Sequence, residues 1–139
     1  MDNKQQELVY KFSMFEQQIQ QIQQQIQVIE QSMVEMNSLM NGMDELTGSK
    51  GKEILAPIGR GIFTKTKLLS EELIVDIGEK NFVKKSIPDT KKLIEKQILK
   101  LEKVRINLNQ NLEKIGQELT QIMQEAQEYE EKKGEKGKG

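Results

Sequence analysis

The residue types that most often carry enzyme chemistry are absent or scattered in this chain. Its 139 residues include no Cys and no His, which removes thiol nucleophiles, disulfides, imidazole bases and the usual zinc and haem ligands. The carboxylates lie mostly beside Lys on faces expected to be exposed, and no paired acid and base stands out. We therefore expect no catalytic residue, no cofactor, no bound metal and no enzyme activity.

Two groups of residues could bind an anion. The segment 48–52, GSKGK, looks like a phosphate-binding loop, but the spacing and the following Ser or Thr of that motif are missing. We interpret it as the exit of a helix. Four lysines could form a basic strip on strands, although such lysines more often protect strand edges from unwanted pairing. They are Lys65, Lys67, Lys84 and Lys85.

Charge and hydropathy exclude two classes of partner. Lys and Arg number 21 and Asp and Glu number 22, so no field of one sign exists to hold nucleic acid or an anionic membrane. The first residues are polar, unlike a signal peptide, and no stretch approaches the ~18 apolar residues of a membrane span. We expect a cytoplasmic protein without nucleic-acid or membrane partners.

Two long segments carry apolar residues at alternating steps of four and three. This 3.5-residue repeat is typical of left-handed coiled coils. The two series mirror each other, with Met43 opposite Ile94 and Leu8 opposite Tyr129, which predicts an antiparallel helical hairpin with both termini at its free end. The first series is Leu8, Phe12, Phe15, Ile19, Ile22, Ile26, Ile29, Met33, Met36, Met40 and Met43, and the second is Ile94, Ile98, Leu101, Arg105, Leu108, Leu112, Ile115, Leu119, Ile122, Ala126 and Tyr129.

Three features modify the second helix. Ser86 and Asp89 have the spacing of a capping box, and Pro88 suits a first turn. Gly116 lies inside the helix and predicts local flexibility. Arg105 occupies a core position opposite Met33, where it could fix the register or mark a hinge. We favour a simpler interpretation, in which its stem packs and its guanidinium reaches Glu30 or Glu35.

The middle of the chain is predicted to form β-strands. Glycines separate short β-branched runs, predicting one hairpin from 53–58 and 61–68, and a second from 73–77 and 82–87. Pro57 cannot donate to a ladder and should lie at an edge or a bulge. The predicted fold class is α+β, with the strands between the two helices. Its parts are residues 1–47 (first helix), 48–86 (hairpins), 87–130 (second helix) and 131–139 (disordered Glu, Lys and Gly tail).

The two hairpins are too small to bury both faces. Isolated hairpins are marginally stable, and neither metal nor disulfide is available to support them. Their edges should therefore pair with other subunits, most economically by closing a β-barrel. The apolar strand residues expected at this interface are Ile54, Ala56, Ile58, Ile62, Phe63, Leu73, Val75, Ile77 and Phe82.

Apolar residues off the coiled-coil seam gather at both ends of the predicted hairpin. Near the strands they are Leu39, Leu93, Leu99, Val104 and Ile106, which oligomer packing would explain. At the free end they are Val9, Tyr10, Met14 and Met123. These four could form an exposed patch that holds other proteins, with methionines suited to varied partners, or they could be ordinary scattered surface residues.

The arrangement of helix, two hairpins and helix resembles the prefoldin alpha subunits of archaeal type. The most specific stretch is 57–63, PIGRGIF, which is similar to the family's turn of proline, aliphatic residue, glycine, any residue and glycine. Residues 75–78, VDIG, and 81–83, NFV, resemble its second hairpin. Two hairpins suggest the alpha class, because beta subunits carry one. The resemblance covers nearly the whole chain except the tail.

The resemblance implies a partner set and a mechanism. Two alpha and four beta subunits would form a double β-barrel body with six coiled coils, whose tips capture non-native proteins without ATP and pass them to a group II chaperonin. Many weak contacts would supply avidity. The tip residues carried over by position are Leu8, Val9, Tyr10, Phe12, Met14, Phe15, Met123, Ala126 and Tyr129.

Two other functions stay open at this point. A structural or adaptor coiled coil would bind one defined partner at its tip and would ignore unrelated unfolded proteins. A nucleic-acid-associated coiled coil would bind with a steep salt dependence, and the balanced charge argues against it.

Overall fold

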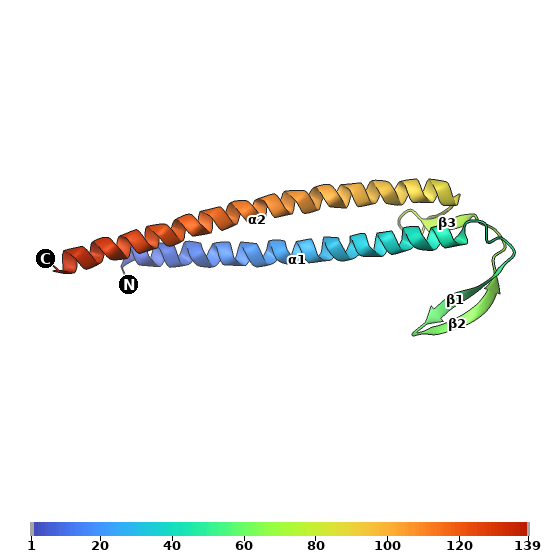
Figure 1. Cartoon of the computed structure of the whole chain (residues 1–139), viewed down its shortest axis with the longest axis horizontal. Helices are drawn as coiled ribbons and strands as arrows, with labels where there is room; N and C mark the ends of the chain where they lie inside the picture. Colours follow the sequence, from blue (N-terminus) through green and yellow to red (C-terminus); the bar gives the residue numbers. More distant parts are fainter. Residues whose placement is uncertain (1, 139) are drawn as a thin grey trace. The chain divides into compact units, whose positions relative to one another are not determined.

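The computed structural model describes residues 2–138 and contains two helices and four strands in the predicted order (Figure 1). The elements are α1 (Asn3–Leu46), β1 (Glu53–Gly59), β2 (Ile62–Lys67), β3 (Leu73–Asp76), β4 (Phe82–Lys85) and α2 (Ile87–Lys138). The chain divides into two compact units. The first unit holds the residues up to 31 and from 102 onward, and the second holds residues 32–101.

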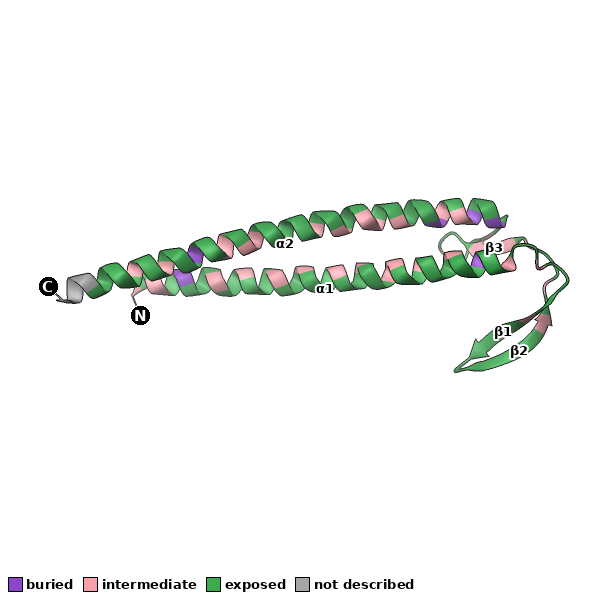
Figure 2. Cartoon of the chain, viewed as in Figure 1, coloured by how far each residue is buried: buried purple, intermediate pink, exposed green. Residues whose placement is uncertain are grey.

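The first unit is a pair of antiparallel helical segments, the beginning of α1 beside the end of α2 (Figure 1). The seam residues predicted from the 3.5-residue repeat are the least exposed ones (Figure 2). Leu8 and Ile122 are buried, and the other seam positions of this unit are half-buried. The residues between them are mostly exposed, as a two-helix coiled coil requires.

The core of the second unit lies where both helices meet the second hairpin. Met43, Ile87 and Ile94 are its buried residues, so the predicted pairing of Met43 with Ile94 is confirmed. Half-buried residues that pack against this cluster are Met36, Met40, Leu46, Leu73 and Ile98. An ion pair between Lys91 and Asp44 also joins the two helices here. Leu73 brings β3 into the helical core.

The four strands form two separate antiparallel hairpins, β1 with β2 and β3 with β4. In the first hairpin Ile54 faces Thr66, and the register shifts between Pro57 and Gly59. The expectation that Pro57 lies at a bulge or an edge is thus confirmed. Bulges absorb a residue that cannot donate to the ladder and increase the local twist. The turn between β1 and β2 includes Gly61 at a φ of 77°, a conformation that glycine adopts without strain.

Ser86 separates the last strand from α2. Its hydroxyl oxygen accepts a hydrogen bond of 3.1 Å from the backbone N–H of Asp89, which satisfies one of the free donors of the first turn. The prediction that the fourth strand continues to Ile87 is therefore wrong. β4 ends at Lys85, and Ile87 begins the helix with its side chain 4% exposed.

The end of α2 differs from the predicted disordered tail. The helix continues past residue 130 and ends at Lys138, and Gly139 lies outside the described residues. Glu and Lys are good helix formers, and this run of both extends the helix despite the two glycines within it. The helix also runs without interruption through Gly116, whose local flexibility stays a prediction. Within residues 2–138, neither helix carries an apolar window long enough to cross a membrane.

Candidate functional site

The predicted tip residues lie at the end of the first unit, and they divide into a surface group and a seam group. The surface group is Val9, Tyr10, Met14 and Met123, with exposed fractions of 52%, 65%, 41% and 56%. Val9 and Met123 each follow a buried seam residue by one position, so both flank the same side of the helix pair. The free end of the unit thus presents apolar side chains to solvent.

The seam group contributes less surface. Phe12, Phe15, Ala126 and Tyr129 are half-buried between the helices. Leu8 is only 5% exposed, so it stabilises the helix pair and does not offer contact surface in this conformation. The reason is that its heptad position faces the partner helix, and its role as a contact residue stays a prediction.

Two shallow grooves run along opposite sides of this helix pair. The tip groove has a volume of about 400 Å³ and is mostly apolar. It is lined by Leu8, Val9, Phe12, Ile122, Met123, Ala126, Gln127 and Glu130. The second groove, of about 360 Å³, has a charged margin and is lined by Lys11, Met14, Phe15, Glu118, Gln121, Ile122 and Glu125. The tip groove is the better apolar binding surface because its charge is confined to Glu130.

A polar cluster stands at the end of the helix pair. The Asp2 carboxylate accepts hydrogen bonds from the Tyr129 hydroxyl and from the backbone N–H of Gln5, the latter at 2.9 Å. Lys133 Nζ lies 3.3 Å from the same carboxylate. These contacts, the Tyr129 bond foremost, lower the pKa of Asp2 to about 2. The bond to Asp2, followed by partial burial, raises the pKa of Tyr129.

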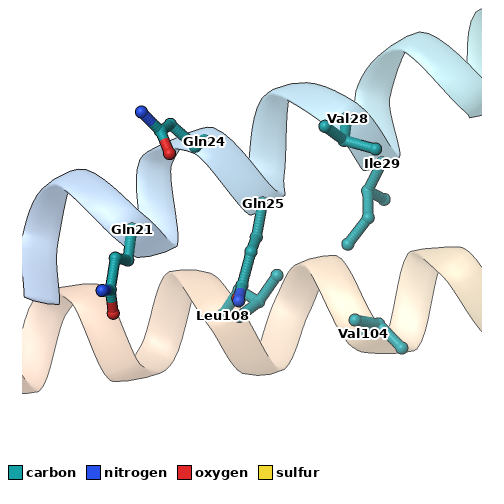
Figure 3. Close-up of a pocket in the computed structure, with 7 residues that line it drawn as sticks. All are labelled: Gln21, Gln24, Gln25, Val28, Ile29, Val104 and Leu108. Atoms are coloured by element: carbon teal, nitrogen blue, oxygen red, sulfur yellow. The ribbon is translucent and has the colours of Figure 1, made fainter.

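A third groove lies further along the first unit, and the sequence analysis did not identify it (Figure 3). Its volume is about 540 Å³, and its lining is uncharged. Gln amides form one part of this lining, and Ile29, Val104 and Leu108 contribute the apolar part. Val28, which is 65% exposed, also lines this groove. The sequence alone could have identified Val28 and the equally exposed Val34 as surface apolar residues, because both lie at off-seam positions.

Arg105 forms a salt bridge with Glu102, one turn earlier on its own helix, at 2.6 Å. The expected partners were Glu30 or Glu35, so this part of the interpretation is wrong. The half-buried side chain agrees with a stem that packs in the seam while its charge reaches outward. A salt bridge within one helix does not fix the register of the coiled coil, because its two residues are one turn apart however the neighbouring helix is positioned.

The hairpins expose most of the predicted interface residues. Ile58, Ile62, Phe63, Ile77 and Phe82 are each more than half exposed. Ile54, Ala56 and Val75 are half-buried, and Leu73 packs against the core of its own unit. The interface residues predicted from the sequence do not include Leu55 and Ile74, which are 62% and 72% exposed. Both alternate with the predicted residues along their strands, so each hairpin presents apolar side chains on a second face.

The cross-strand pairs mix apolar and basic side chains. Leu55 faces Lys65 in the first hairpin, and Ile74 faces Lys84 in the second. Each hairpin has only two strands, so every strand leaves one backbone edge unpaired within its own sheet. Lysines beside such edges discourage random pairing, whereas the apolar neighbours favour a specific partner. Among the side chains that the structure describes, those of residues 2–134, no group of three Asp or Glu residues is placed to hold a metal ion.

A family model described as prefoldin subunit matches residues 15–132 of this chain. The chain belongs to the prefoldin family. It is 31% identical over 115 residues to a prefoldin subunit alpha of Methanobrevibacter smithii, covering 79% of each protein. It is 30% identical over 128 residues to prefoldin subunit alpha 1 of Methanocaldococcus jannaschii, covering 91% of this chain and 90% of that relative.

The fold also matches a solved prefoldin chain. A chain in the cryo-EM structure of filamentous PFD from Methanocaldococcus jannaschii superposes with a TM-score of 0.74 at 19% identity, covering 84% of this chain and 98% of that one. The predicted α+β coiled-coil hairpin and the resemblance to archaeal prefoldin alpha subunits are both confirmed. Prefoldin subunits are chaperone subunits and not enzymes, and they assemble with other prefoldin subunits.

Proposed function

We propose that this prefoldin subunit is an ATP-independent holdase, which captures non-native proteins at its tip and hands them to a group II chaperonin. The observation that supports the proposal best is the apolar tip groove with Val9 and Met123 exposed on its two sides. An exposed apolar surface on a coiled-coil end has no role in folding of the pair itself. Methionine adapts to partners of different shape because it is flexible and polarizable.

The proposal includes the assembly. Two alpha subunits would join four beta subunits through the hairpins, and a non-native protein would contact several tips at once. Each contact would be weak, and their combination would raise the effective affinity. Release stays fast because every single contact is reversible. The cytoplasmic location stays a prediction.

The test is the suppression of aggregation for several unrelated unfolded proteins by the assembly with a beta-type partner. The double variant Val9→Ser/Met123→Ser should lose most of the suppression, since it removes apolar area from both sides of the tip groove. The matched control is Val34→Ser/Ile106→Ser, which changes one exposed apolar residue on each helix away from the tip.

Three results would separate the alternatives. Equal loss in the tip variant and the control would contradict a tip-specific role. Binding of a single defined protein, with no effect on unrelated unfolded ones, would favour an adaptor. Transfer is tested by adding a group II chaperonin to the assembly loaded with labelled client, and failure of the client to move would contradict the handover.

A further inference from the structure

Asp2 connects the two helices at the free end of the first unit, although it lies outside the 3.5-residue repeat. Its carboxylate accepts a hydrogen bond from the Tyr129 hydroxyl, 127 residues away in the sequence. Lys133, one turn beyond Tyr129 on α2, contacts the same carboxylate oxygen at 3.3 Å. Two groups on α2 therefore converge on one side chain at the start of α1.

Asp2 also caps α1. The backbone N–H of Gln5 donates to the Asp2 carboxylate at 2.9 Å, and the Gln5 side-chain oxygen accepts from the Asp2 backbone N–H at 3.3 Å. This reciprocal pair is a capping box, which holds the first turn of a helix. The same carboxylate thus fixes the first turn of α1 and joins it to α2. Loss of the contacts to α2 alone would leave the cap in place.

The residues next to these contacts belong to the apolar tip. Ala126 and Glu130, which flank Tyr129 on α2, line the tip groove. Leu8 lies at the base of the same groove and is 5% exposed. Tyr129 is the last seam residue of α2, so beyond it no apolar layer holds the helices together. At this end of the helix pair, the contacts of Asp2 with Tyr129 and Lys133 join the two helices in place of apolar packing.

We infer that Asp2 and Tyr129, supported by Lys133, form a latch that closes the tip and keeps Leu8 buried. An open latch lets the helix ends separate and adds Leu8 and more of Phe12 to the exposed apolar surface. The latch thereby sets how much surface the tip offers and how strongly it holds a non-native protein. This last consequence rests on the proposed function, whereas the closure of the helix ends does not.

The decisive variant is Tyr129→Phe, which removes only the hydroxyl and keeps the ring in the seam. Hydrogen exchange measured on the full chain should accelerate roughly fivefold in the first turns of α1 and around residues 122–133, the effect expected for one modest hydrogen bond. The matched control is Tyr10→Phe at the same end of the molecule, because the Tyr10 side chain is 65% exposed. It should leave exchange unchanged.

Asp2 provides a second, graded test. Asp2→Asn keeps one side-chain oxygen that can accept from the Gln5 N–H, and its amide NH2, which replaces the second oxygen, can donate to the Tyr129 hydroxyl oxygen. The charge that attracts Lys133 is lost. This variant should retain most of the protection against exchange, whereas Asp2→Ala should lose it. This rescue by the conservative variant separates the hydrogen bond from a general effect of changing the helix end.

The functional readout is the dissociation rate of an unfolded protein from the assembly. Tyr129→Phe should slow release by roughly threefold or more, since extra apolar surface strengthens each contact. Unchanged exchange in Tyr129→Phe would overturn the latch, whereas faster exchange with unchanged release would overturn its effect on how strongly the tip holds a non-native protein. If exchange accelerates but even the unmodified assembly holds no unfolded protein, the closure of the helix ends is supported and the proposed function fails.

Discussion

The Ser86 hydroxyl oxygen lies 3.1 Å from the backbone nitrogen of Asp89, and this hydrogen bond ends the strand region and begins α2. The Ser86 carbonyl also accepts from the Thr90 hydroxyl at 2.8 Å, and Thr90 is only 5% exposed. One residue therefore satisfies several polar groups of the first turn. The turn stands next to the buried Ile87 and so fixes where the helical core starts.

Replacing Ser86 by Ala should destabilise the chain by about 1 kcal/mol, the usual cost of losing a side-chain cap. Ser86→Asp, which restores an acceptor at the same position, should be close to the unmodified chain. Chemical denaturation followed by circular dichroism measures both. Equal stability of the Ala and Asp variants would show that the cap contributes nothing.

Met43→Ala should destabilise the second unit by about 2–5 kcal/mol, because it leaves a cavity beside Ile87 and Ile94. Met43 is 3% exposed. Leu99→Ala is the control, since Leu99 is 62% exposed and its truncation should change the free energy of unfolding by no more than about 0.5 kcal/mol. Similar losses in both variants would contradict the assignment of the core to this cluster.

Arg105→Leu should stabilise the coiled coil by about 1 kcal/mol. The half-buried seam position then holds an apolar side chain, and only a local ion pair on one helix is lost. Lys103→Leu changes an exposed charge two residues away and should have little effect on thermal unfolding. A destabilised Arg105→Leu variant would favour the alternative in which Arg105 marks a hinge or fixes the register.

The latch predicts a stability change at the two extremes of pH. The pKa of Asp2 is lowered to about 2, so its contribution is present above about pH 4 and is lost as the pH falls toward 2. The pKa of Tyr129 is raised, so its contribution is present below about pH 10 and is lost as the pH rises through the folded value.

Thermal melting of Tyr129→Phe and of the unmodified chain, compared from pH 2 to pH 11, measures this dependence. The difference in melting temperature between the unmodified chain and Tyr129→Phe should be constant in the middle of this pH range and should shrink at both ends. An NMR titration of the Asp2 carboxyl carbon gives its pKa directly. A value near 4 would show that the carboxylate is not held by Tyr129 and Lys133.

The hairpin surfaces predict which substitutions block assembly. Ile74→Ser/Phe82→Ser removes two exposed apolar side chains that share the outer face of the second hairpin. The native mass of the mixture with a beta-type partner should decrease, while the helical circular dichroism stays unchanged. Thr64→Ser, at an exposed polar position of the first hairpin, is the control and should assemble normally.

The sequence predicted most of the local structure because its signals are local. The repeat from Leu8 to Met43 identifies the buried stripe of α1 residue by residue, since a helix places every such position on one face. Pro57 predicted the bulge because a residue without an N–H cannot take part in a regular ladder. Ser86 predicted the start of α2 for an equally local reason.

Contacts between distant residues needed the tertiary structure. Leu73 has the pattern of a strand residue whichever partner it meets, and only the fold shows that it packs on the helical core. Arg105 was expected to reach Glu30 or Glu35 on the other helix, and only the structure shows that it pairs with Glu102 on its own helix. The sequence by itself determined which faces are apolar, because periodicity is a property of each element alone. Only the tertiary structure decided that Asp2 meets Tyr129, because a contact over 127 residues depends on how the two helices lie together and leaves no periodic signal.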